Sequence, residues 1–217
     1  MYREALQLCE KLLSRDHPDT LAIMNNLAGV LRCQGQYTGA EAMYREALQL
    51  YEKLLGRDHP NTLGSMNNLA GTLSSQGKYA ESEAMHCEAL QLCEKVLGRD
   101  HPDTLANKNN LAEVLTRQGQ YAKAGAMYRE VLQLCEKLLG RDHPDTLATM
   151  NNIAGVLSIQ GQHAEAKLMH HETLQLKEKM LGHDHPDTLV SINNLAEVLK
   201  DRASIPRPRR CIARHGS

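Results

Sequence analysis

The sequence predicts an all-α protein, an α-solenoid of antiparallel helix pairs. The first observation behind this prediction is a 42-residue repeat of the tetrapeptide His-Pro-Asp-Thr, with Asn for Asp in one copy. The copies begin at His17, His59, His101, His143 and His185. The second observation is that each period holds two stretches of apolar residues at helical spacing, separated by a short Gly-containing turn. Because such helices must stack on neighbours to bury their apolar stripes, the copies are expected to form a continuous array.

The first helix of the unit at residues 59–100 has clear start and stop signals. Gly56 tolerates the left-handed conformation that ends the preceding helix. Pro60 suits the first helical turn, where its missing N–H costs nothing. Either Asp58 or His59 takes the N-cap position. The helix then carries one apolar stripe, formed by Leu63, Met66, Leu69, Ala70 and Leu73.

The second helix of this unit follows the turn Gln76-Gly77-Lys78-Tyr79 and is expected from about Ala80 to Leu97. The residues expected to point inward are Ala84, Met85, Ala89, Leu90, Leu92, Val96 and Leu97.

The repeat sets the expected organisation of the chain. Four complete units occupy residues 17–58, 59–100, 101–142 and 143–184. Residues 1–14 match a lone second helix, residues 185–200 match a lone first helix, and residues 201–217 break the pattern. Because no polar capping repeat is visible at either end, the chain is expected to be a piece of a longer array.

Composition excludes several classes of function. The formal net charge is −1, which gives no basic footprint for nucleic acid. Trp and Phe are absent, so base stacking on an aromatic platform is not expected. No apolar run is long enough to span a membrane. The six Cys contain no C-x-x-C pair and there is no signal-peptide core, which predicts reduced thiols and a cytoplasmic location.

The helix-pair pattern resembles the tetratricopeptide repeat, although each unit is eight residues longer than the 34-residue motif. The residues at the motif positions are Met24, Leu27, Ala28 and Leu31 in the first helix, and Ala40 and Tyr44 in the second. The long unit, with Leu-Gly-Arg-Asp-His-Pro before the first helix and Asn-Asn-Leu-Ala within it, is similar to the repeats of kinesin light chains. It is also similar to those of nephrocystin-3-like proteins and nucleotide-binding sensor proteins. The resemblance implies a tetratricopeptide-repeat superhelix whose first helices line a concave face.

The chain departs from these families in three respects. It has no amino-terminal heptad segment of the kind that joins kinesin light chains to the motor chain. It has no G-x-x-x-x-G-K-[ST] phosphate loop of the sensor proteins. Lys108 stands on the apolar stripe where the other units have Met or Ile, and it is expected to loosen its unit unless its head reaches solvent.

The Asn pairs are the candidate binding residues, because they lie off the apolar stripe of the first helices. An Asn amide offers donors and acceptors that match the backbone of an extended peptide, and the resemblance implies this role in a concave groove. Arg32 and Arg117 are expected on the same side, where they could attract acidic side chains. The alternative is that the Asn pairs satisfy contacts between helices or units; both can hold for different members of a pair. The candidate groove residues are Asn25, Asn26, Arg32, Asn67, Asn68, Asn109, Asn110, Arg117, Asn151, Asn152, Asn193 and Asn194.

The His residues do not predict a metal site. The five in the helix-start turns repeat with the fold, which favours capping or packing between units. Others crowd the fourth unit, but His170 and His171 diverge by about 100° on a helix instead of converging on a metal. No metal or cofactor is therefore expected.

No catalytic residue is expected either. Cys9, Cys93 and Cys135 share a repeat position with Tyr51 and Lys177, which predicts a partly exposed helix face. No Cys or Ser has an identifiable base and orienting group, so an enzyme is not expected.

The basic segment at residues 201–217 is expected to be disordered. Permitted codons read in a shifted frame can spell a further second helix, which suggests that this segment is frameshifted. The helix at residues 186–200 would then lack its partner, and we expect it to fray or self-associate.

The sequence thus favours a non-catalytic protein-protein interaction scaffold that binds extended peptides in its concave groove. The expected partner is a protein or peptide, with acidic ligands favoured by the two arginines. The resemblance alone adds the kinesin motor complex and a role as a cargo adaptor. The alternatives are the repeat sensor of a nucleotide-binding signalling protein and a truncated gene remnant without a selected function.

Overall fold

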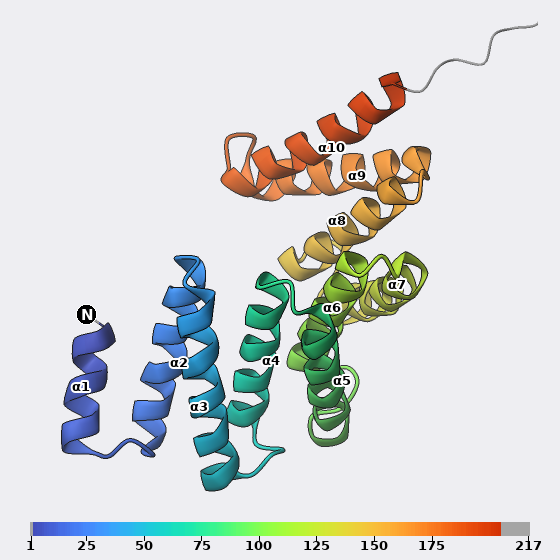
Figure 1. The fold of residues 1–217 in the computed structure, drawn as a ribbon. Helices are drawn as coiled ribbons and strands as arrows, with labels where there is room; N and C mark the ends of the chain where they lie inside the picture. The colour runs from blue at the N-terminus through green and yellow to red at the C-terminus, as the bar shows by residue number, and fades with distance from the viewer. Residues whose placement is uncertain (1, 205–217) are drawn as a thin grey trace, which may run out of the picture. The chain divides into compact units, whose positions relative to one another are not determined.

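The computed structural model describes the backbone of residues 2–204 and the side chains of residues 4–200. This part of the chain forms helices without any strand (Figure 1). The helices are α1 (Tyr2–Leu12), α2 (Pro18–Cys33), α3 (Tyr37–Leu55), α4 (Pro60–Ser75), α5 (Tyr79–Val96), α6 (Pro102–Arg117), α7 (Tyr121–Leu138), α8 (Pro144–Ile159), α9 (His163–Leu181) and α10 (Pro186–Ser204). None of these helices is long and apolar enough to cross a membrane.

The chain divides into two compact units, Met1–Leu138 with α1 to α7 and Leu139–Ser217 with α8 to α10. Within each unit, every helix packs against the next one in the chain. In the first unit α4 also contacts α2 and α6, so the first helices of successive pairs lie beside one another. The prediction of an all-α solenoid of antiparallel helix pairs is confirmed.

The helix starts show why the His-Pro turn recurs. His59 occupies the N-cap of α4, and its Nδ1 accepts a hydrogen bond of 3.1 Å from the backbone N–H of Asn61. Thr62 Oγ1 donates to the carbonyl of Gly56, whose φ of 91° lies in the region that favours glycine. The same Nδ1 bond forms at the four equivalent histidines, His17, His101, His143 and His185. The choice between Asp58 and His59 thus resolves to His59, and the capping interpretation of these histidines is confirmed.

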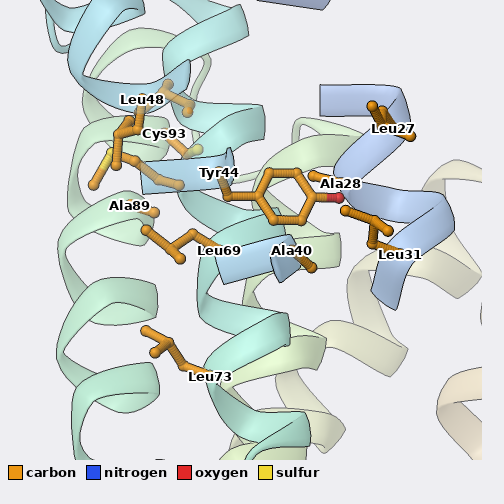
Figure 2. Packing of buried hydrophobic residues seen from close by; sticks show 12 residues of the cluster. Leu27, Ala28, Leu31, Ala40, Tyr44, Leu48, Leu69, Leu73, Ala89 and Cys93 are labelled. Atoms are coloured by element: carbon orange, nitrogen blue, oxygen red, sulfur yellow. The ribbon is translucent and has the colours of Figure 1, made fainter. Parts of the chain in front are cut away.

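Tyr44 of α3 shows how the helix pairs pack. Its side chain is almost fully buried, and Figure 2 shows its ring directed from α3 towards Ala28 of α2. A Cβ atom added at Gly29 would lie 3.3 Å from the Tyr44 hydroxyl oxygen. Small residues on α2 therefore provide the space that the ring fills.

The inward face predicted for the second helix is partly wrong. In α5, Ala84 and Val96 are exposed. The residues buried in α5 are Ser82, His86, Ala89 and Cys93. Since α5 packs against both α4 and α6, its buried face extends beyond a single apolar stripe. Ser82 is accommodated because its hydroxyl donates a 2.7 Å hydrogen bond to the carbonyl of Ala70.

The prediction for the repeat position shared by Cys9, Cys93 and Cys135 is also corrected. The prediction of a partly exposed face fails because Cys93, Cys135 and Tyr51 are each buried, while Cys9 and Lys177 are half-buried.

Helix α10 ends four residues beyond the boundary expected at residue 200. On its expected stripe Leu189 and Leu199 are exposed, while Ile192, Leu195 and Ala196 are half-buried. The rest of the basic segment, residues 205–217, lies outside the described residues, so the structure does not test the frameshift hypothesis.

Candidate functional site

A polar cavity of about 260 Å³ lies in the first unit, where α2, α4 and α6 run beside one another and α5 contributes one residue. Five of the predicted groove residues line it: Arg32, Asn67, Asn68, Asn110 and Arg117. The other lining residues are Gly71, Ser74, Ser75, His86, Glu113 and Val114. The 42-residue period places the Asn pairs of α4 and α6 at equivalent positions, and the packing of these helices brings them together.

The Asn residues in the first unit make contacts between repeats as well as lining the cavity. Asn110 Nδ2 of α6 donates a 3.0 Å hydrogen bond to Asn67 Oδ1 of α4. Asn25 Oδ1 of α2 accepts one of 3.1 Å from Ser65 Oγ of α4. The alternative in which the Asn pairs satisfy contacts between units therefore holds for these residues. Asn68 is half-buried at the cavity, Asn26 is exposed, and Asn109 is half-buried on α6.

The predicted groove residues in the second unit make local contacts. Asn151 Oδ1 lies 3.1 Å from His170 Nδ1, and Asn193 Nδ2 donates a 3.4 Å hydrogen bond to Glu197 Oε1. Asn152 is exposed and Asn194 is half-buried.

The two arginines differ in charge compensation. Arg117 Nη2 lies 2.7 Å from Glu113 Oε1, and this hydrogen bond raises the pKa of Arg117. Arg32 Nε is buried without a hydrogen-bond partner, and no carboxylate among residues 4–200 forms an ion pair with Arg32. The cavity thus has one neutralised guanidinium and one with its charge uncompensated.

His86 is a cavity residue that the sequence reasoning missed. Its ring is buried, and its Nδ1 donates to Asn107 Oδ1 at 2.9 Å. Burial lowers the pKa of His86, against the opposing effects of Asn107 and Glu113, so the ring is neutral at pH 7. The repeat position could have indicated that His86 is buried, because His86 stands where the other units have Tyr44 and Tyr128.

The charged head of Lys108 does not reach solvent. Its side chain is 5% exposed, and its Nζ lies 2.6 Å from Glu130 Oε1 and 3.1 Å from Glu94 Oε1. Burial lowers the pKa of Lys108, but these two carboxylates outweigh burial and the pKa is raised. The expectation for Lys108 is therefore corrected: two carboxylates on α5 and α7 receive the charged head.

The arrangement is suited to non-covalent recognition. The part of the chain that the structure describes holds no group of three His, Cys, Asp or Glu side chains that could bind a metal. His170 is buried beside Asn151, whereas His171 is exposed. The cavity instead offers amides, hydroxyls and one uncompensated guanidinium, which bind polar and anionic groups.

Stacked antiparallel helix pairs on a fixed period define a helical-repeat protein of the solenoid class. A family profile described as tetratricopeptide repeat matches residues 1–53, 20–95, 64–111 and 104–179. The chain therefore belongs to the tetratricopeptide repeat family.

Solved structures extend this likeness to kinesin light chain-like repeats. The nearly identical TPR-like repeats of a Podosopora anserina protein assigned to the kinesin light chains superpose with a TM-score of 0.73 at 26% identity, covering 86% of this chain and 89% of that one. A point variant of those repeats gives a TM-score of 0.74 at 26% identity, with 86% and 88% covered. BtubC (BKLC) from P. vanneervenii shares the fold, with a TM-score of 0.75, 23% identity, and 96% and 91% covered. No curated protein matches the chain.

The repeats and their kinesin light chain-like neighbours make this chain a protein-interaction scaffold. Members of this family typically bind proteins or peptides and are typically non-catalytic.

Proposed function

We propose that the chain binds an extended peptide segment of a partner protein in the groove between α2, α4 and α6, without catalysis. The observation that carries the proposal is the cavity of about 260 Å³, which gathers Asn68, Asn110 and Arg32 from three successive first helices. Amide groups spaced along such a groove match the alternating N–H and C=O groups of an extended backbone. The Asn67–Asn110 hydrogen bond fixes part of this surface before a ligand arrives, which reduces the entropy lost on binding.

The preferred ligand carries acidic side chains. Arg117 is already paired with Glu113, so the attraction for a carboxylate comes mainly from Arg32. The likeness to kinesin light chain repeats supports the further proposal that the chain acts in the cytoplasm as a cargo adaptor of a kinesin motor complex. The same likeness favours the adaptor over the nucleotide-binding sensor.

Peptide binding to the purified chain tests the proposal. A random eight-residue peptide library is screened, and the strongest binder is measured by fluorescence anisotropy at two salt concentrations. We expect acidic peptides to bind best, more weakly at high salt because ionic strength screens charges. Arg32→Gln is expected to reduce affinity about tenfold, in line with the loss of one charge-assisted hydrogen bond.

Arg129→Gln is the matched control, because Arg129 is exposed on α7 and does not line the cavity. If both substitutions change affinity equally, or if no peptide binds, the proposed groove is wrong.

A further inference from the structure

Glu113 of α6 lines the cavity at a repeat position where the preceding first helices have glycine. The equivalent residues of α2 and α4 are Gly29 and Gly71. The space beside Gly71 is taken by Arg32 of α2, because Arg32 Nη1 lies 3.4 Å from the place of a Cβ atom added at Gly71. The guanidinium of Arg32 therefore reaches α4, the helix next to the one that carries Glu113.

One repeat later, the chain has no side chain that reaches across in the same way. The residue of α4 equivalent to Arg32 is Ser74, which lines the cavity together with Glu113. A serine side chain is too short to cross to α6 as Arg32 crosses to α4. The cavity of about 260 Å³ is therefore open beside Glu113, and a ligand side chain that enters it there meets this carboxylate.

Glu113 brings a negative charge next to Arg117, which lines the same cavity. Its Oε1 accepts hydrogen bonds of 2.7 Å from Arg117 Nη2 and 3.1 Å from Arg117 Nε. The side chains of Arg117 and Glu113 are 51% and 54% exposed, so a ligand can approach both. A carboxylate that approaches Arg117 also approaches Glu113, and the repulsion from Glu113 offsets the attraction of the guanidinium.

The spacing of the helices places this pair at a defined distance from Arg32. Packed helices are typically about 8–10 Å apart, and an extended peptide rises about 3.3 Å per residue. A peptide whose acidic side chain binds the Arg32 guanidinium beside α4 therefore presents the residue roughly two or three positions further along to the pair on α6.

We propose that Glu113 is a specificity-determining residue of the groove: it selects peptides with a single acid, bound at Arg32, against peptides with a second acid two or three positions away. This inference rests on the proposed function. With an uncharged residue at position 113, Arg117 binds the second carboxylate, and the groove prefers peptides with two acids. Glu113 thus uses one cavity arginine within the chain and leaves the other for the ligand.

Paired peptides test the inference on the full chain. The strongest singly acidic binder from the library is remade with Glu or Gln, one position at a time, two and three residues to either side of its acid. In the parent chain, fluorescence anisotropy is expected to give affinities within about twofold for each Glu and Gln pair, because a half-exposed pair with no net charge attracts a carboxylate little. In Glu113→Gln, one Glu peptide is expected to bind at least about fivefold more tightly than its Gln counterpart, because it gains a charge-assisted hydrogen bond.

Two further variants identify the group responsible. The double variant Glu113→Gln and Arg117→Gln should lose the gain for the second acid, since the gain comes from the released guanidinium. Glu88→Gln is the matched control, because Glu88 also lies 2.7 Å from an arginine of the first unit, Arg57, but does not line the cavity. It removes the same charge from the chain and should behave like the parent.

The outcomes separate this inference from the proposed function. If singly acidic peptides bind but Glu113→Gln gains no preference for a second acid, the role of Glu113 is overturned and the groove stands. A gain that persists in the double variant, or that Glu88→Gln shows equally, overturns it as well. If no peptide binds to the parent chain, the groove is wrong and the role of Glu113 falls with it.

Discussion

Lys108 Nζ lies 2.6 Å from Glu130 Oε1, and this ion pair takes the place of one that other repeats make at the same carboxylate position. Arg57 pairs with Glu88 at 2.7 Å, and Arg15 pairs with Glu46 at 2.6 Å. Arg141 and Glu172 form the equivalent pair in the second unit at 2.7 Å. Arg99, which stands at the arginine position of the Lys108 repeat, lies 3.8 Å from Glu94 instead. In this repeat the carboxylate at that position therefore pairs with the lysine on the apolar stripe instead of with the arginine.

Replacing Lys108 should cost less stability than removing the charges of Glu94 and Glu130. Lys108→Met introduces the residue of the equivalent positions 24, 66 and 150. We expect the variant to be as stable as the parent or up to about 2 kcal/mol more stable, because a packed apolar side chain replaces a desolvated charge. The double change Glu94→Gln and Glu130→Gln should destabilise the chain by about 1–2 kcal/mol, since it leaves a buried ammonium uncompensated. Urea unfolding measures both; a Lys108→Met variant less stable than the double variant would contradict this.

Glu41 should make the first unit sensitive to acid. Its carboxylate lies 2.8 Å from Lys78 Nζ and also pairs with Arg45, and these contacts lower its pKa from 4.5 to about 2. Because folding lowers the pKa of Glu41, its carboxylate stabilises the folded state fully at pH values above its pKa in the unfolded chain. This contribution is lost as the pH falls from about 4.5 to about 2. Glu41→Gln should cost about 1–2 kcal/mol at pH 7, allowing for solvent screening of the exposed cations, and little at pH 2.

Denaturant unfolding across this pH range checks the Glu41 prediction. Glu81→Gln is the control, because Glu81 is more exposed and, among the residues whose side chains the structure describes, forms an ion pair only with Arg45, at 3.1 Å. A loss of stability in Glu41→Gln that stayed constant down to pH 2 would show that packing, not charge, is responsible.

His86 should add a second pH dependence, in a higher range. Burial lowers its pKa below 6.5, so the unfolded chain takes up a proton that the folded chain resists. Stability from the neutral ring is present above pH 6.5 and declines as the pH falls through the folded pKa. His86→Tyr introduces the residue of the equivalent positions 44 and 128 and should flatten the stability profile below pH 6.5.

The slope of stability against pH is the readout for His86, because the loss of the bond to Asn107 can shift absolute stability. His171→Gln, at an exposed histidine, should leave the slope unchanged. Equal slopes for the parent and His86→Tyr would rule out a buried neutral His86.

Tyr44 should be among the most sensitive core positions. Its ring is buried between α2 and α3, and Tyr44→Ala should destabilise the chain by about 3–5 kcal/mol through lost burial and a residual cavity. Tyr37→Ala, at a half-buried tyrosine of the same helix, should have a smaller effect. Thermal unfolding, monitored by circular dichroism, compares the two variants. Similar losses of stability in both would show that burial of the Tyr44 ring does not make this position especially sensitive.

The period, the helix starts and the core face of the first helices could all be predicted from the residue order alone. The predicted stripe of Leu63, Met66 and Leu69 is buried, and His59 caps α4 as one of the two residues that the sequence proposed. These features could be predicted because they depend on residues a few positions apart: a cap bonds to a backbone N–H two residues away, and a stripe follows the helical period.

The contacts between polar side chains, in contrast, depend on how the helices pack. The hydrogen bond from Ser65 to Asn25 spans 40 residues, and that from Asn110 to Asn67 spans 43. Helices α3, α5 and α9 each pack on both sides, so their buried faces do not follow a single local stripe. Lys108 and Asn107 are buried next to partners on neighbouring helices, Glu130 and His86. A buried charge or amide needs such a partner, and packing decides which group lies within hydrogen-bond distance.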